Sequence, residues 1–235
     1  MKDDIDSRRI LVWDAPTRLF HWLTVLSFFG AYLSAESERW RLVHVTLGYT
    51  MAGLVCFRVV WGVLGTRHAR FSNFVRSPAA AWRYLSSLAR GRPEHHVGHN
   101  PAGALAIIAL LLLACAVTVT GWAAYNEAGG EWLGELHEST ANTMLALIGL
   151  HVLAVFLSSW LHRENLTRAM ISGYKAGQPG QGIPRAWWGI AGLMLIAVLG
   201  FWWIQWLIKT LRYSSKTRSS TTCKAMAFWR KAPLF

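Results

Sequence analysis

Apolar residues gather in five long blocks along this chain, and short stretches that hold most of the charged residues separate them. The hydrocarbon core of a bilayer is about 30 Å thick, and roughly 20 helical residues span it. We therefore predict membrane-spanning helices over 19–33, 44–64, 102–125, 136–161 and 187–208. The first block is short for a span, unless its helix includes 13–17 at the membrane interface or continues past residue 35.

Composition supports an all-α integral membrane protein. Hydrophobic residues make up 53% of the chain and charged residues only 15%, which is unlike an ordinary soluble domain. We expect a four-helix transmembrane bundle and a fifth, C-terminal transmembrane helix. The predicted organisation is an N-terminal segment over 1–18, a membrane domain over 19–208 and a basic tail over 209–235, in which the polar stretch 214–222 is expected to be disordered.

The positive charges alternate between successive loops. The formal net charge is +12, and the segments before the first block, between the second and third, and between the fourth and fifth hold 14 Lys and Arg residues. The two other loops hold two. This is the asymmetry of the positive-inside rule, and it predicts a cytoplasmic N-terminus and no nucleic-acid partner. The tail departs from the rule, because five spans would export its seven Lys and Arg residues.

Two histidines share one apolar block. His137 and His151 are fourteen residues apart, so on a helix they return to within about 40° of each other, roughly 21 Å apart along the axis. Polar side chains at such depths in a membrane are costly and usually functional. One helix would therefore present an imidazole towards each membrane face.

His21 and His44 lie at the starts of the first two blocks. With antiparallel helices, His44 reaches the depth of His137 near the outer face, and His21 reaches the depth of His151 near the cytoplasmic face. Imidazole pairs inside a helical bundle are typical axial ligands of haem iron, so the four predict two haems held non-covalently. The alternative is that they are interfacial or hydrogen-bonded histidines. No Cys-x-x-Cys-His motif is present, which excludes covalent c-type attachment.

Two arginines accompany the inner pair. Arg58 follows His44 by fourteen residues, which places it at the depth of His21 and His151, and Arg18 precedes His21 by three. Either guanidinium could bind a haem propionate, for which its geometry is well suited. The alternative for both is that they extend to the cytoplasmic headgroups.

The remaining histidines lie in loops or at membrane edges. His95, His96 and His99 resemble a metal cluster, but only Glu94 is a nearby carboxylate, and a solvated basic loop is the favoured interpretation. His68 and His162 are expected at the membrane interface.

Several segments resemble the bacterial cytochrome b561 family, which is related to the b-type cytochrome subunits of nickel–iron hydrogenases. They are VWDAPTRLFHW at 12–22, HVTLGYTMAGLVCFRVVWGVLGTRHARFSNFVRSP at 44–78 and the paired histidines of the fourth block. The resemblance covers about 12–174. It implies a four-helix haem-binding bundle in a bacterial inner membrane, two b haems, quinone-linked electron transfer, and His21, His44, His137 and His151 as ligands.

The expected function is electron transfer between the quinone pool and a redox partner at the outer face, such as a c-type cytochrome. Alternatives are the anchor subunit of a hydrogenase or reductase complex, a stand-alone quinone-linked oxidoreductase acting on a small outer substrate such as superoxide, and a transporter whose histidines relay protons. Whether the chain is itself an enzyme is left open. Five side chains could bond a quinone oxygen, or only backbone or a neighbouring helix: Thr118, Thr120, Asn142, Ser158 and Ser159.

Overall fold

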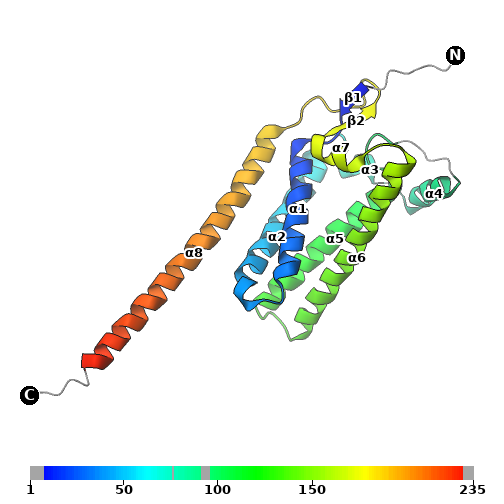
Figure 1. Ribbon diagram of the computed structural model, residues 1–235. Coiled ribbons are helices and arrows are strands. Elements are labelled where there is room, and N and C mark those ends of the chain that lie inside the picture. Colours follow the sequence, from blue (N-terminus) through cyan, green and yellow to red (C-terminus); the bar gives the residue numbers. More distant parts are fainter. Residues whose placement is uncertain (1–7, 76, 91–95, 230–235) are drawn as a thin grey trace, which may run out of the picture. The chain divides into compact units, whose positions relative to one another are not determined.

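The computed structural model describes residues 8–75, 77–90 and 96–229 of the chain. Four long helices form an antiparallel bundle (Figure 1): α1 (Ala15–Ser34), α2 (Arg41–Leu64), α5 (Pro101–Tyr125) and α6 (Trp132–Leu161). At one end, the short helix η1 (Glu38–Trp40) joins α1 to α2 and residues 126–131 join α5 to α6. We call this the hairpin end.

The opposite end carries the smaller elements and is called the ribbon end. They are β1 (Arg8–Leu11), α3 (Phe71–Phe74), α4 (Pro78–Ala89), α7 (Leu166–Ser172) and β2 (Tyr174–Gly177). The strands pair antiparallel, with Arg8 opposite Gly177 and Leu11 opposite Tyr174. The N-terminal segment is thus paired with the chain that follows α6.

Gly173 makes this junction possible. Its φ of 89° ends α7, and its carbonyl accepts the backbone N–H groups of Val12 at 2.8 Å and Trp13 at 3.0 Å. A Cβ at this position would lie 2.7 Å from the Trp13 carbonyl oxygen. Glycine therefore meets both the left-handed conformation and the close backbone approach.

Capping groups fix where two of the helices begin. The Asp14 carboxylate accepts the backbone N–H of Thr17 at 2.7 Å, with Pro16 in the first turn, so α1 begins four residues before the predicted start at residue 19. Asn100 caps α5 in the same way, accepting from Gly103 N at 2.7 Å, and Pro101 follows it. The apolar pattern alone does not locate such starts.

Four helical stretches are long and apolar enough to cross a membrane: Glu38–Leu64, Pro101–Tyr125, Trp132–Leu161 and Trp188–Leu211. The predicted first span is not among them. Helix α1 still has 20 residues, about 30 Å of helix, which matches the hydrocarbon core. It packs along α2, and Gly30 permits close approach, because a Cβ there would lie 2.6 Å from Leu47 Cδ1.

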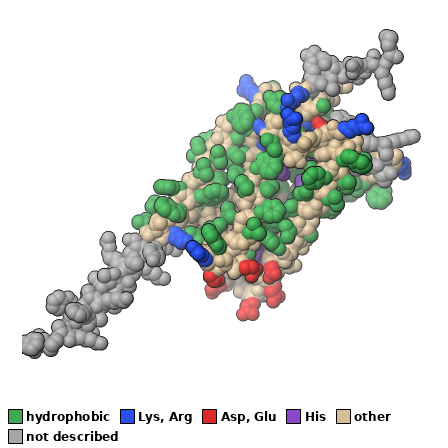
Figure 2. All heavy atoms as spheres, in the orientation of Figure 1, with side chains coloured by type: hydrophobic (Ala, Val, Ile, Leu, Met, Phe, Trp, Pro, Cys, Tyr) green, Lys and Arg blue, Asp and Glu red, His purple; other side chains and the backbone are tan. Residues whose placement is uncertain are grey.

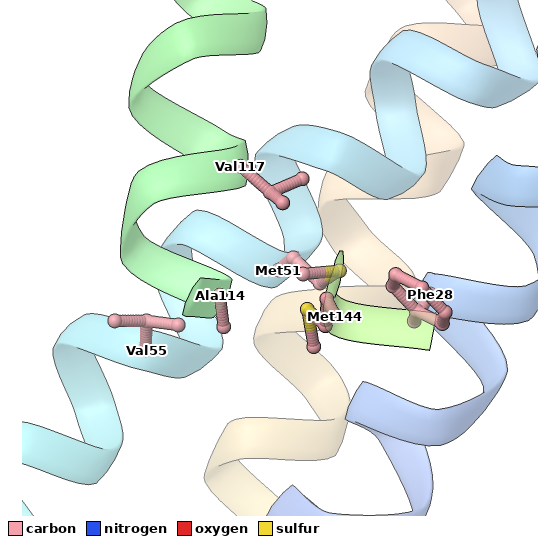
Figure 3. Packing of buried hydrophobic residues seen from close by; sticks show 6 residues of the cluster. All are labelled: Phe28, Met51, Val55, Ala114, Val117 and Met144. Atoms are coloured by element: carbon pink, nitrogen blue, oxygen red, sulfur yellow. The ribbon is translucent and has the colours of Figure 1, made fainter. Parts of the chain in front are cut away.

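The middle of the bundle is an apolar core to which all four long helices contribute (Figure 3). Its buried members are Phe28 from α1, Met51 and Val55 from α2, Ala114 and Val117 from α5, and Met144 from α6. Phe28, Met51 and Met144 each follow a predicted ligand of their helix by seven residues, or two turns. The core therefore occupies the depth between the two predicted histidine pairs.

Helix α8 (Trp188–Trp229) begins within the first compact unit, and residues 193–235 form a second one. The helix runs through 214–222, where disorder was expected. Its 42 residues make about 63 Å of helix, roughly twice the hydrocarbon thickness, although only Trp188–Leu211 has the composition of a span.

Candidate haem sites

The histidine pair nearer the hairpin end is assembled from α2 and α6. The ring centroids of His44 and His137 are 6.0 Å apart, and the ring planes are inclined by 86°. A metal–imidazole bond is about 2 Å long, so two imidazoles that share one metal ion have centroids roughly 6 Å apart. The spacing of this pair therefore fits two axial ligands on one iron.

Backbone carbonyls orient both rings. His44 Nδ1 lies 2.8 Å from the Ala31 carbonyl oxygen, and His137 Nδ1 lies 3.0 Å from that of Val117. A carbonyl only accepts hydrogen bonds, so each Nδ1 carries the proton and each neutral Nε2 keeps its lone pair. This is the usual arrangement of metal-ligating histidines, whose second nitrogen donates to a carbonyl or carboxylate.

Gly121 on α5 makes room for His137. A Cβ at Gly121 would lie 2.8 Å from His137 Cε1 and 3.0 Å from Nδ1. Any larger residue would push the imidazole away from the Val117 carbonyl. Gly48, one turn after His44, has open space at its Cβ position, as a cavity for a flat ligand requires.

His21 of α1 and His151 of α6 lie close enough for charge on one ring to act on the other. They come from the ends of α1 and α6 that meet the ribbon end. His21 Nδ1 is buried and has no hydrogen-bond partner among the described residues. The structure thus places each predicted pair at its own end of the bundle, and the unpartnered nitrogen is available to a ligand or a bound group.

Arg18 and Arg58 are buried, with 9% and 3% of their surfaces exposed. The Arg58 guanidinium stacks over Phe71 at 4.8 Å, and that of Arg18 lies over Trp188 at 4.9 Å and donates to the Ile171 carbonyl at 2.6 Å. Neither side chain therefore extends to the lipid headgroups, which was the alternative considered for both arginines. Arg58 Nη1 and Arg18 Nε are buried without a hydrogen-bond partner in the described part of the chain, so each retains a donor for an anion.

Asp14 connects this region, and the sequence did not single it out. Besides capping α1, its carboxylate accepts from Trp61 Nε1 at 3.2 Å and from the Thr66 hydroxyl. Only 1% of the residue is exposed. The Asp-x-Pro capping signal was readable in the sequence, but its partners 47 and 52 residues away were not.

His99 is packed at the ribbon end, and the solvated loop expected for it is wrong. Its ring lies 4.4 Å from Trp13 and 4.8 Å from Phe74. Burial, followed by the positive charges of Arg58 and Lys175, lowers the pKa of His99 to about 3.

The other loop histidines are also held by protein contacts. His96 stacks edge-on with Tyr84, His68 Nε2 bonds the Gln181 carbonyl at 2.8 Å, and the Tyr84 hydroxyl lies 3.2 Å from His162 Nε2. His95 lies outside the described residues. Within the described ranges, no group of three His, Cys, Asp or Glu side chains could hold a metal ion.

The quinone candidates are mostly engaged locally. The Thr118 and Thr120 hydroxyls donate to carbonyls one turn earlier in α5, and Ser159 Oγ accepts from Leu166 N. Asn142 differs, because its side-chain oxygen accepts from the Tyr32 hydroxyl of α1 at 2.7 Å. The Ser158 hydroxyl makes no hydrogen bond to another described residue.

Apolar helices long enough to span a membrane, with an imidazole pair spaced to share one metal ion inside their bundle, are typical of a membrane b-type cytochrome. Residues 12–173 match the family described as prokaryotic cytochrome b561, and the chain belongs to this family. It is an electron-transport protein of the multi-pass membrane class that binds haem b.

Several curated proteins are similar to this chain in sequence. A probable Ni/Fe-hydrogenase B-type cytochrome subunit of Azotobacter chroococcum mcd 1 is 27% identical over 71% of this chain and 88% of its own length. The probable Ni/Fe-hydrogenase 1 B-type cytochrome subunit of Escherichia coli (strain K12) is 29% identical over 49% of this chain and 60% of its own. The Rhodobacter capsulatus subunit is 23% identical over 74% and 86%. No solved structure matches the chain.

Proposed function

We propose that this chain is a di-haem cytochrome b that carries electrons across the membrane between a redox partner at the outer face and the quinone pool. The observation that carries the proposal is the His44–His137 pair, with its 6.0 Å spacing and both Nδ1 atoms donated to carbonyls. A haem bound there would supply one-electron oxidation and reduction. The protein residues would fix its position and tune its potential.

His21 and His151 are proposed as ligands of the second haem. Arg18 and Arg58 would bind the propionate groups of this haem, because each keeps a buried N–H donor without a partner among the described residues. Their two positive charges also exceed the single negative charge of the nearby carboxylate. The carboxylate near both is Asp14, which already accepts bonds from Trp61 and Thr66. A buried guanidinium without an anion is costly, and a propionate would remove that cost.

Orientation follows from the loops. The ribbon end carries the basic segments, so we assign it to the cytoplasmic side of a bacterial inner membrane and the hairpin end to the outer side. His44 and His137 would then serve the outer haem, and His21 and His151 the inner one.

We propose a hydrogenase-type redox subunit as the partner at the outer face. This choice rests on the relatives, which are probable Ni/Fe-hydrogenase B-type cytochrome subunits. A c-type cytochrome is the second candidate, since no contact in the chain selects between them. A stand-alone oxidoreductase would be active after purification without any co-purifying subunit.

Haem stoichiometry tests the proposal. Purified full-length protein should contain two b haems per chain, both six-coordinate and low-spin when oxidised, because two imidazoles fill each iron. His44→Ala and His137→Ala should remove one spectral component, and His21→Ala and His151→Ala the other. A ratio near one haem per chain, or loss of the same component in His44→Ala and His21→Ala, would contradict the pairing. A haem-free protein would favour the transporter alternative.

A further inference from the structure

The two histidine pairs differ in the charges and hydrogen bonds around them. We infer that the ribbon-end site holds its haem at a higher midpoint potential than the hairpin-end site, so that a single electron shared by the two resides mainly at the ribbon end. This inference rests on the proposed function, since it requires both haems. It gives the direction in which the chain itself favours electron movement, from the hairpin end to the ribbon end.

Hydrogen bonding to the ligands lowers the potential at the hairpin end. Both imidazoles donate Nδ1–H to carbonyls, His44 to Ala31 and His137 to Val117. Such a bond makes Nε2 a stronger electron donor, which stabilises the oxidised iron. His21 Nδ1 at the ribbon end has no such acceptor among the described residues, so its Nε2 lacks this effect.

Buried charge raises the potential at the ribbon end. Two guanidiniums, Arg18 and Arg58, share this region with one carboxylate, Asp14, so they offset the negative charge of haem propionates bound there, whereas the described residues of the hairpin end include no buried cation that would do so. The nearby Lys175 and Glu164 form an ion pair at 3.2 Å and cancel each other. A positive charge favours the reduced state, which carries one more electron, and buried charges are weakly screened.

Charge at the hairpin end has the opposite sign. Six glutamates and two arginines lie in residues 34–43 and 126–138, and Glu135 and Glu138 flank His137 in sequence. Figure 2 shows acidic side chains gathered at this end of the bundle. These groups are exposed and therefore screened, but they act in the same direction as the hydrogen bonds and favour the oxidised state.

The apolar core keeps the two environments distinct. Phe28, Met51 and Met144 are at most 3% exposed and lie two turns from His21, His44 and His137 on their helices. No charged group is among the buried members of this core. Each site is therefore governed mainly by its own surroundings.

Redox titration of the purified full-length protein, followed by the haem absorption bands, tests the order. The haem that remains in His44→Ala should have a midpoint potential at least 59 mV above that of the haem that remains in His21→Ala. For a one-electron couple, 59 mV corresponds to a tenfold preference of the electron for the ribbon-end haem. Equal potentials or the reverse order would overturn the inference. Fewer than two haems in the unaltered protein would instead contradict the proposed function.

Gly121→Ala tests the order with both haems in place, in case the histidine variants do not fold. The added Cβ would displace His137 from the Val117 carbonyl and weaken the 3.0 Å hydrogen bond. The lower of the two midpoint potentials should then rise while the higher stays unchanged. Gly134→Ala is the control, since a Cβ at that position of α6 contacts nothing within 4 Å. A shift confined to the higher component, or no shift at all, would overturn the inference.

Discussion

Arg58 is a buried charged side chain near the proposed inner haem site, and a substitution can isolate its effect on that haem's potential. A unit charge at roughly 8 Å contributes about 2 kcal/mol at an effective dielectric constant near 20, before screening. We expect Arg58→Leu to lower the midpoint potential of the inner haem and to leave the outer one nearly unchanged. Redox titration of both components measures this.

Arg41→Leu is the matched control for Arg58→Leu. Arg41 also belongs to α2, but its side chain is 64% exposed and lies at the hairpin end, paired with Glu38. The Arg41→Leu substitution should leave the midpoint potential of the inner haem unchanged. An inner potential unaffected by Arg58→Leu would show that the guanidinium does not act on the haem.

His99 should make stability depend on pH. Burial first, and neighbouring positive charges second, hold its folded pKa at about 3, against 6.5 for a free histidine. Below pH 6.5 the unfolded chain binds a proton that the folded chain does not, so stability should fall as the pH falls from about 6.5 towards 3. Thermal unfolding in detergent should show a shallower acid loss for His99→Gln. Identical pH profiles for the two proteins would contradict this assignment.

At the residue scale, spacing along one helix predicted that the two histidines of α6 lie at two depths, because helical geometry is local, and the antiparallel order of the helices predicted which histidines share each depth. Neither predicted the carbonyls that orient His44 and His137, or the packing of His99 against Trp13 and Phe74. Those contacts join residues far apart in the sequence, and no periodicity within one element contains them.

Among the elements, α1 depends on its cap. Asp14→Ala removes an N-cap, which usually costs about 1 kcal/mol, and leaves the buried Trp61 indole without its acceptor, which costs about 1–3 kcal/mol more. We expect a loss of roughly 2–4 kcal/mol in the free energy of unfolding in detergent. Asn165→Ala is the control, because it removes an exposed cap of α7 and should cost about 1 kcal/mol. Equal losses for the two variants would contradict the role of Asp14 in joining α1 to α2.

The elements were predictable to different degrees. Blocks of apolar residues located α2, α5, α6 and the apolar part of α8, since the bilayer imposes their length. The pairing of β1 with β2 escaped prediction because each strand has only four residues and its partner lies more than 160 residues away. The continuation of α8 through a polar stretch has no apolar signal to predict it.

At the scale of the whole molecule, the loops at the two ends of the four-helix bundle differ in charge, and this sets the expected orientation in the membrane. Fourteen Lys and Arg residues in the ribbon-end segments, against two in the hairpin-end loops, predict that the ribbon end faces the cytoplasm. Starting from a variant without Cys56, Cys115 and Cys223, a single cysteine can be placed at Glu127 or at Ser77, both of which are exposed. In intact cells with a permeable outer membrane, a membrane-impermeant maleimide should label Glu127→Cys at once and Ser77→Cys only after lysis. The reverse pattern would show that the bundle has the opposite orientation, with the proposed ribbon-end haem site and its buried arginines at the outer face.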